Sequence, residues 1–397
     1  MALSYFDKAV IFLLPILVLQ LFKDQTVYLS IEYIYSVTIV IIPFLDLGLV
    51  GYFFYIYRNK EDKRQIVNEV TKIFHIVYFI LFALGLGIIC VHYYVFSIDD
   101  NIIYIVSRAI FLSTFAFLSS YYRLKNKPER GLYVTITANV ISLIFLFIYV
   151  LLGLEFDLWV IFIGQILFCV LYFFKVARLI ILKWRKQYQN TQIKSVLKAS
   201  ILFSWPSIIQ VFIMMYIANY GKINALEMMS LNDGTLLSII QRFSMLVQLT
   251  HGALLAFMIK EIYVSGNILE IKTNLLKKYF AALVFSIFCV LCLTIGYFSF
   301  NDVHYDLNRL ILALTFIIGY TFIWCFTSYL EVYYSRENKN KIKLYLAIIN
   351  AIFFVGILNI SGLGYLEKIT AAMFFSTLVT FIISLAVLKQ RKYYLSK

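Results

Sequence analysis

Charged residues are scarce in this sequence, and their scarcity excludes an ordinary water-soluble protein. Only 14% of the 397 residues are Asp, Glu, Lys or Arg, whereas 62% are hydrophobic. Soluble domains average about 25% charged and roughly 45–50% apolar residues. A soluble chain of this composition would expose apolar surface and aggregate, but the same surface suits a lipid bilayer, where the solvent is hydrocarbon. We therefore expect an integral membrane protein.

Side chains that commonly carry catalysis or bind metals are also few. The four histidines are dispersed along the chain, and the five cysteines all fall inside apolar runs. Cys289 and Cys292 form a C-x-x-C pair, but no second pair or nearby histidine completes a zinc or redox site. No Ser/His/Asp set and no glycine-rich phosphate loop can be assembled. We expect no catalytic residue, no metal site and no cofactor.

Long apolar runs dominate the sequence instead. A helix needs about 20 apolar residues to cross ~30 Å of hydrocarbon. Runs of this kind predict spans at 5–22, 29–57, 73–96, 102–122, 131–153, 158–182, 198–220, 234–259, 278–299, 308–332, 343–361 and 369–388. The predicted fold class is therefore an all-α integral membrane protein with about twelve transmembrane helices.

The positive charge of the chain is concentrated in alternate loops. A net charge of +14 would suit a nucleic-acid-binding protein, but the Lys and Arg residues lie in short clusters between the apolar runs. With twelve spans, 26 of the 35 Lys and Arg residues fall on one side and four on the other. Basic loops stay in the cytoplasm. We expect a multi-pass protein of the bacterial inner membrane, with both termini cytoplasmic and no nucleic-acid partner.

The chain also shows an internal repeat. The longest loop, about 183–197, divides it into two six-helix lobes, 1–186 and 187–397. YYRLKNKPERGLYVTI begins at Tyr121, and YYSRENKNKIKLYLAI begins 212 residues later at Tyr333, with seven identical positions and no gap. A six-helix unit begins and ends on the same side of the membrane, so its duplication predicts a parallel repeat. Transporters use this arrangement to place a substrate site between two lobes.

Three stretches resemble a known family. YSVTIVIIPFLDLGLVGYFFYIYR, from Tyr35, contains an aspartate–leucine–glycine segment that resembles that of the O-antigen (Wzx-type) polysaccharide flippases of the multidrug/oligosaccharidyl-lipid/polysaccharide exporter superfamily. ILFSWPSIIQVF has Pro206 where the family often has proline, and residues 236–257 resemble its entry into the second lobe. One departure is the end of the seventh span, where the family commonly shows an aspartate and this chain reads ANYGK from Ala218.

The resemblance implies transport, not catalysis. It implies a flippase that moves a polyprenyl-diphosphate-linked oligosaccharide from the cytoplasmic to the outer leaflet by alternating access, in O-antigen, lipopolysaccharide or other surface polysaccharide biosynthesis. Its partners would be the lipid-linked substrate, the bilayer, and a polysaccharide polymerase and glycosyltransferases. The alternatives are a small-molecule antiporter of the same superfamily and a membrane-embedded polymerase or acyltransferase. An enzyme of the latter kind is expected to show a large outer loop or a histidine cluster, and the sequence has neither.

Two arginines are the candidate substrate-binding residues. Ionisable groups inside a span cost about 2.5–3.5 kcal/mol each on insertion scales, so they mark functional sites by default. Arg108 and Arg242 both lie roughly 9–12 Å inside their helices at ~1.5 Å per residue, one in each predicted lobe. The guanidinium fork binds phosphate bidentately and stays charged. The alternative is that each arginine pairs with a carboxylate or extends to the membrane surface.

The remaining ionisable residues within the spans have more ordinary interpretations. Asp46 follows Pro43 in a segment that is expected to bend, and it either titrates as a coupling carboxylate or hydrogen-bonds across a helix interface. Lys175 and Arg178, near the cytoplasmic end of their span, are expected to extend their charged ends towards the membrane surface. Glu32 and Glu331 lie near helix ends and are expected to reach water.

Overall fold

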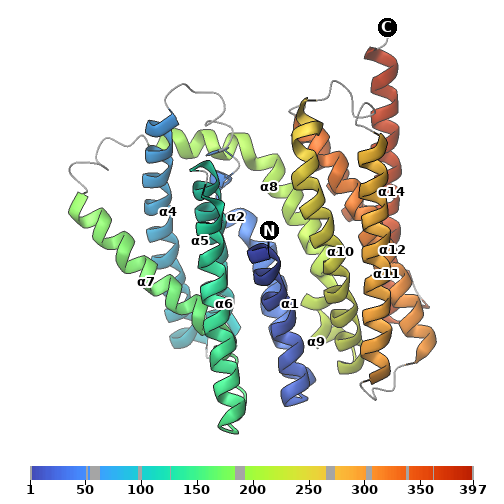
Figure 1. Ribbon diagram of the computed structural model, residues 1–397, viewed down its shortest axis with the longest axis horizontal. Helices are drawn as coiled ribbons and strands as arrows, with labels where there is room; N and C mark the ends of the chain where they lie inside the picture. Colours follow the sequence, from blue (N-terminus) through green and yellow to red (C-terminus); the bar gives the residue numbers. More distant parts are fainter. Residues whose placement is uncertain are drawn as a thin grey trace. The chain divides into compact units, whose positions relative to one another are not determined.

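The computed structural model describes residues 2–50, 52–53, 63–96, 101–125, 127–183, 193–264, 273–300, 306–336, 339–360 and 362–395. Within these ranges the chain is helical and contains no strand (Figure 1). The helices are α1 (Ala2–Phe22), α2 (Gln25–Leu45), α4 (Lys63–Val91), a short π-helix η1 (His92–Phe96), α5 (Asn101–Leu124), α6 (Pro128–Leu151), α7 (Trp159–Lys183), α8 (Ile193–Ile223), α9 (Ala225–Met228), α10 (Leu231–Val264), α11 (Thr273–Phe300), α12 (Leu307–Arg336), α13 (Asn340–Leu358) and α14 (Tyr365–Leu395).

The predicted all-α membrane fold is confirmed. Ten of the described helices are long and apolar enough to cross a membrane. Two further long helices, α1 and α10, coincide with the predicted spans 5–22 and 234–259. In α1 the apolar stretch is only Ala9–Phe22. In α10 polar side chains dilute the apolar run, and several of them, Gln241 and Arg242 included, are buried inside the protein.

The chain divides into two compact units, which we call the N-terminal unit (Met1–Ile208) and the C-terminal unit (Ile209–Lys397). The division falls within α8. The predicted lobe boundary at residues 186 and 187 lies outside the described residues.

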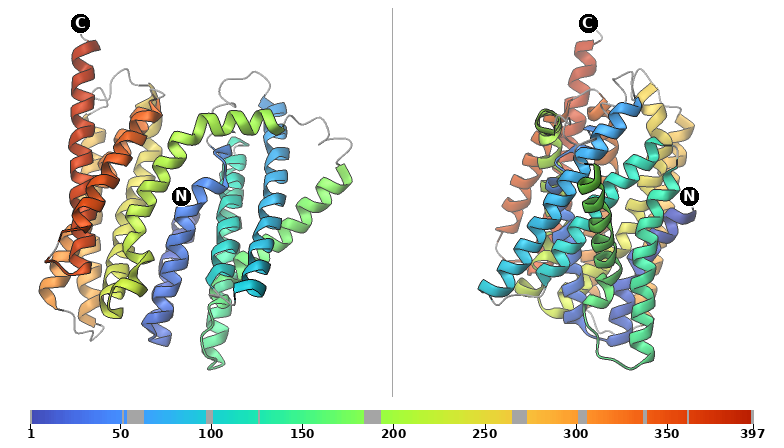
Figure 2. Two further views of the ribbon diagram at one scale, coloured as in Figure 1. Left: turned by 180° about the vertical axis from the view of Figure 1, so that it is seen from behind. Right: turned by 90° about the vertical axis from the view of Figure 1, so that its left-hand side faces the viewer.

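In the N-terminal unit, α5 packs against α2, α4, α6 and α7. The α6–α7 contact is close because Gly164 has no side chain: a Cβ atom there would overlap the backbone carbonyl of Ala138. An aromatic stack fills the space between α4 and α5, with the Phe74 and Phe117 ring centroids 3.7 Å apart. Towards its C-terminal end α7 diverges from α4 and α5 (Figures 1 and 2).

In the C-terminal unit, α12 packs against α10 and α14, while α13 packs against α14 and α11 against α10. Its apolar core joins α8, α10, α12 and α14 through buried side chains such as Ile217, Leu237, Ile317 and Ile369. Glycine again permits a close approach, because a Cβ atom on Gly319 of α12 would overlap the ring of Phe374 on α14.

One predicted span is not a single helix. The run 29–57 was expected to be continuous, but α2 ends at Leu45 and a turn follows before Leu49. Leu47 and Gly48 adopt left-handed backbone angles, with φ of +49° and +69°. Such angles cannot continue an α-helix, and glycine adopts them without a steric cost. The bend expected around Asp46 is therefore a complete break.

The sequence repeat has a structural counterpart in two turns. At the end of α5, the amide of Lys127 donates to the carbonyl oxygen of Tyr122 at 2.9 Å. At the end of α12, the amide of Lys339 donates to the carbonyl oxygen of Tyr334 at 2.8 Å. The donors and the acceptors are both 212 residues apart, as in the sequence repeat. The repeated tyrosine and lysine therefore make the same backbone hydrogen bond at the end of a helix in each unit.

Candidate functional site

Arg108 lies inside the N-terminal unit, where α2, α5 and α7 meet. Its side chain is 4% exposed. The guanidinium carbon is 3.6 Å from the centre of the Tyr35 ring of α2, and Nη1 donates a hydrogen bond to Oε1 of Gln165 on α7 at 3.2 Å. A planar cation that stacks on an aromatic face and bonds an amide oxygen is partly compensated for its loss of water. The arginine is thus held between three helices.

The burial of Glu32 contradicts the prediction made from the sequence. Glu32 was expected to reach water, but it is 1% exposed. It lies one helical turn before Tyr35, and residues three apart on a helix share a face. The buried carboxylate is therefore on the side of α2 that packs against the α5 helix of Arg108. Burial of a carboxylate is tolerated in a helix bundle only where polar or charged groups surround it.

Asp46 stabilises the break after α2. Its Oδ1 accepts a hydrogen bond from the amide of Gly48 at 2.8 Å, which closes a turn between residues two apart. Two carbonyl oxygens of the turn accept hydrogen bonds from α8: Ser200 donates to Leu47 O at 3.0 Å and Ser204 donates to Gly48 O at 3.2 Å. The Gly48 oxygen also accepts from the amide of Tyr52 at 3.0 Å. The Asp46 bond lies within its own turn and not across a helix interface, which was the structural alternative predicted for it. The turn gives a physical reason for the aspartate–leucine–glycine segment.

Arg242 lies in the C-terminal unit, on α10, and is 2% exposed. Thr235 and Ser238, at the helical spacing of seven and four residues before it, are also buried. The neighbouring Gln241 donates to the carbonyl oxygen of Ala218 on α8 at 3.4 Å. One face of α10 is therefore a polar stripe that is directed into the protein and not into lipid, as expected of a helix with a functional interior.

The C-terminal unit also contains an ion-pair cluster that the sequence reasoning missed. Arg309, in the first turn of α12, contacts Glu367 on α14 with Nε to Oε1 at 2.7 Å. Its Nη1 also contacts Oδ1 of Asp233 on α10 at 3.1 Å. Both carboxylates lie in the first turn of their helices, where a negative charge stabilises the helix dipole. The position of all three residues beside predicted outer loops was the available signal.

A buried histidine has a hydrogen-bonding role. His251 of α10 is buried, and its Nδ1 lies 2.6 Å from the hydroxyl oxygen of Tyr279 on α11. Its ring also contacts that of Trp324 on α12. In the part of the chain that the structure describes, no three His, Cys, Asp or Glu side chains lie close enough together to hold a metal ion.

Comparison with solved structures identifies the fold. The lipid II flippase MurJ, in an inward closed conformation, aligns with a TM-score of 0.59 and 16% identity over 98% of this chain and 87% of that chain. The fold of this chain is therefore similar to that of the MurJ structure. An inward-facing multidrug resistance MATE family transporter of the MOP superfamily aligns with a TM-score of 0.54 and 13% identity, over 93% of this chain and 92% of that chain.

The comparisons by sequence give no further assignment. The sequence matches no protein-family profile and no curated protein. At 13–16% identity the structural likeness establishes the fold and not the substrate. It covers nearly the whole chain in both cases.

Proposed function

We propose that the protein is a flippase for a polyprenyl-diphosphate-linked oligosaccharide, moving it from the cytoplasmic to the outer leaflet by alternating access in surface polysaccharide biosynthesis. The observation that carries the proposal is the pair of buried arginines, Arg108 and Arg242, on membrane-spanning helices of a fold shared with a lipid II flippase. Lipid II is a lipid-linked substrate, and the resemblance of the segment around Asp46 to the O-antigen flippases supports the same substrate class.

The chemistry of the substrate explains why arginine is suited to this role. A diphosphate that crosses ~30 Å of hydrocarbon must exchange its water for fixed positive charge. Arginine provides that charge at any physiological pH and binds two phosphate oxygens at once. Arg108 is 4% exposed in the present conformation. Substrate contact therefore requires a conformation in which phosphate oxygens replace the Gln165 carbonyl as the acceptor of its hydrogen bond.

A flipping assay normalised to folded protein tests the arginines. Arg108→Ala or Arg242→Ala should each remove a charge-assisted contact of about 1.5–3 kcal/mol, which is roughly a ten- to hundredfold loss of affinity. Arg108→Lys keeps the charge but loses the fork and the stacking on Tyr35, so rescue should be partial.

The structural alternative makes a different forecast for the same variants. If an arginine only neutralises a buried carboxylate, its removal lowers the amount of folded protein and leaves transport per molecule unchanged. Arg178→Ala on α7 is the matched control, because Arg178 is an exposed cation and should tolerate replacement. Wild-type transport by well-folded Arg108→Ala and Arg242→Ala variants would remove both residues from the substrate path.

The proposal includes insertion in the inner membrane with both termini on the cytoplasmic side. The 26-to-4 distribution of Lys and Arg residues between the two sides supports this orientation. Single cysteines at positions 186 and 341 should be protected from a membrane-impermeant label in intact cells. Cysteines at positions 101 and 301 should be labelled, once the five native cysteines have been replaced. An accessible label at position 186 or 341 contradicts the orientation.

The rival functions are separated by the product of the reaction. A flippase returns lipid-linked oligosaccharide with unchanged mass, whereas a polymerase or acyltransferase alters it. The structural likeness to a MATE transporter keeps a small-molecule antiporter as the second candidate. Proton- or sodium-driven uptake of a cationic dye into proteoliposomes, without movement of lipid-linked oligosaccharide, would favour the antiporter.

A further inference from the structure

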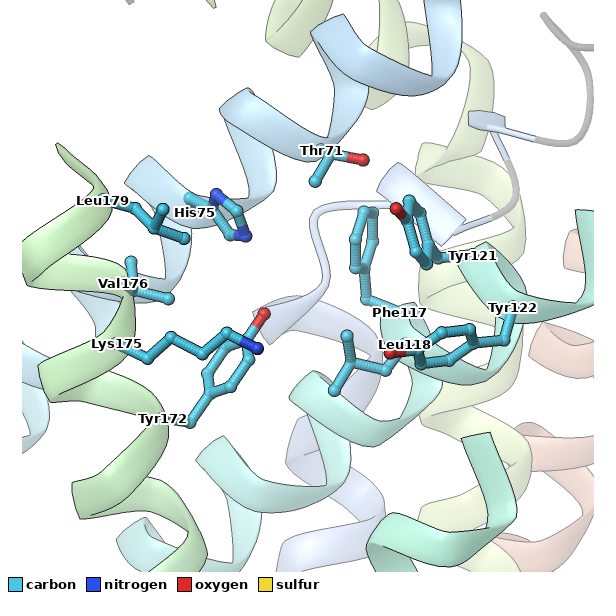
Figure 3. Close-up of a pocket in the computed structure, with 10 residues that line it drawn as sticks. All are labelled: Thr71, His75, Phe117, Leu118, Tyr121, Tyr122, Tyr172, Lys175, Val176 and Leu179. Atoms are coloured by element: carbon cyan, nitrogen blue, oxygen red, sulfur yellow. The ribbon is translucent and has the colours of Figure 1, made fainter. Parts of the chain in front are cut away.

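A pocket lies within the N-terminal unit between α4, α5 and α7, separate from Arg108. Its volume is about 210 Å³. Polar groups reach it from three helices, and Figure 3 shows His75 of α4 and Lys175 of α7 both directed into it. Tyr121 and Tyr122 of α5 form the opposite wall. The pocket therefore has a defined polar side that is built from distant parts of the chain.

The polar side of this pocket suits an anion. The lining consists of Thr71, His75, Phe117, Leu118, Tyr121, Tyr122, Tyr172, Lys175, Val176 and Leu179. None of these ten residues is acidic, so no lining carboxylate neutralises the Lys175 ammonium. The ammonium nitrogen lies 6.0 Å from the centre of the Tyr172 ring, and Lys175 is exposed. The Thr71 hydroxyl already donates to the carbonyl oxygen of Val67 at 2.6 Å. The Lys175 cation, the imidazole and the tyrosine hydroxyl groups form a set of donors that phosphate oxygens accept from.

The outer flank of the pocket suits acyl chains. Leu171 lies one turn before Lys175 on α7 and is 69% exposed, and the adjacent Phe174 is 64% exposed. On a membrane helix such apolar side chains face lipid. The divergence of α7 from α4 and α5 opens this end of the helix (Figure 1). An anionic group beside Lys175 is thus continuous with an apolar surface along the same helix.

We infer that the α4–α5–α7 pocket binds the phosphate of an anionic lipid, with the lipid's acyl chains lying along α7. The size of the pocket, about 210 Å³, limits the ligand to a headgroup. Drug-sized ligands occupy about 300–1,000 Å³, so an oligosaccharide does not fit. The inference is independent of the flippase proposal, because it requires only a phosphate-bearing lipid.

Native mass spectrometry of the full chain in detergent tests the inference. The probes are dioleoyl phosphatidic acid, dioleoyl phosphatidylcholine and inorganic phosphate. Wild-type protein should retain phosphatidic acid in preference to phosphatidylcholine. Lys175→Gln should weaken phosphatidic acid binding roughly tenfold, while Lys175→Arg should keep it, because both cations donate to phosphate. Arg178→Gln, an exposed cation on the same helix that does not line the pocket, is the matched control and should bind as the wild type.

Each outcome decides a separate point. Equal losses in Lys175→Gln and Arg178→Gln would mean that surface charge alone attracts the lipid, and the pocket assignment would be wrong. Wild-type binding by Lys175→Gln would also overturn it. Competition by millimolar inorganic phosphate would show that the pocket binds phosphate but does not require a lipid to supply it.

Arg108→Ala should bind phosphatidic acid normally, so failure of the flippase proposal and failure of this inference remain distinguishable. Lys175 is exposed, and size-exclusion chromatography should confirm that its variants fold.

Discussion

The turns after α5 and α12 are alike in backbone and different in what their side chains do. In both, a lysine amide donates to a tyrosine carbonyl oxygen five residues earlier, and an amide three residues further on donates to the lysine carbonyl oxygen at 3.1 Å in one turn and 2.9 Å in the other. Yet Tyr122 lines the pocket beside α7. The hydroxyl of its counterpart, Tyr334, is buried and donates to the carbonyl oxygen of Ser384 on α14 at 3.1 Å.

This difference indicates which features a duplicated membrane unit keeps. The turn is kept because its backbone hydrogen bonds depend on chain direction and not on particular side chains. The packing beside the turn can differ between the two units. Tyr334 hydrogen-bonds to the neighbouring helix α14, whereas Tyr122 lines a pocket. The two units also differ in how their helix ends are held. The N-terminal unit uses serine bonds to the broken end of α2, and the C-terminal unit uses the Arg309 ion pairs.

The largest expected effect is a loss of stability when a side chain is added at Gly48, in the break after α2. In Gly48→Ala, the new Cβ would overlap Ser204 Cβ, and the backbone φ of +69° disfavours any side chain. Left-handed geometry and overpacking together should destabilise the protein by about 2–4 kcal/mol. We expect a lower melting temperature and less folded protein after detergent extraction.

Two further variants show whether that loss arises at the break. Gly87→Ala on α4 is the matched control, because its Cβ would have no neighbour within 4 Å, and it should leave the melting temperature unchanged or slightly raised. Adding Ser204→Gly to Gly48→Ala relieves the overlap but removes a hydrogen bond, so recovery should be partial. A normal melting temperature for Gly48→Ala alone would show that α8 does not hold this break.

A smaller effect is expected in the C-terminal unit, at the ion-pair cluster. Arg309→Ala leaves the Asp233 and Glu367 carboxylates without their shared cation. The arginine side chain is 38% exposed, so solvent screening keeps the expected loss to about 1–2 kcal/mol. Thermal melts at low and high salt should show this loss most clearly at low salt.

The neighbouring cation of α14 provides a control for the ion pairs. Lys368→Ala removes a positive charge next to Glu367 in the sequence and should change the melting temperature little. Neutralising the two acids as well, with Asp233→Asn and Glu367→Gln, should recover part of the stability lost in Arg309→Ala. If Lys368→Ala and Arg309→Ala lose stability equally, general charge balance and not the specific contacts stabilises these helix ends.

Much of the architecture was predictable because membrane helices follow simple physical rules. The apolar runs located the long helices, and the match between the segments from Tyr121 and Tyr333 located equivalent turns in the two units. The break near Asp46 was predicted only as a bend. Pro43 and Gly48 signal irregular backbone, but the extent of the break depends on Ser200 and Ser204, about 150 residues away along the chain.

The contents of the candidate sites were harder to predict. Burial of Glu32 could not be read from its distance to a helix end, because that distance does not say which face of α2 meets α5. The pocket around Lys175 depends on the divergence of α7 from α4 and α5. Side-chain packing between the helices determines that divergence, and no local sequence pattern predicts it. The expectation that Lys175 extends towards the membrane surface rested on its place near the end of a span, which does not show that His75 and Tyr172 lie beside it.

The smallest expected effect compares the two tyrosines of the repeat directly. Tyr334→Phe removes one buried hydroxyl that bonds Ser384, and a hydrogen bond of this kind contributes about 1 kcal/mol. Tyr122→Phe removes the equivalent hydroxyl from the border of a pocket, where water can replace it, so stability should change by less than about 0.5 kcal/mol. The measurement is a pair of melts in the same detergent, where only Tyr334→Phe should lower the melting temperature. Equal shifts would mean that the hydroxyl groups of Tyr122 and Tyr334 contribute equally to stability, which would contradict the proposed difference between the two turns. A larger loss in Tyr122→Phe would reverse the comparison and assign the pocket wall a structural role.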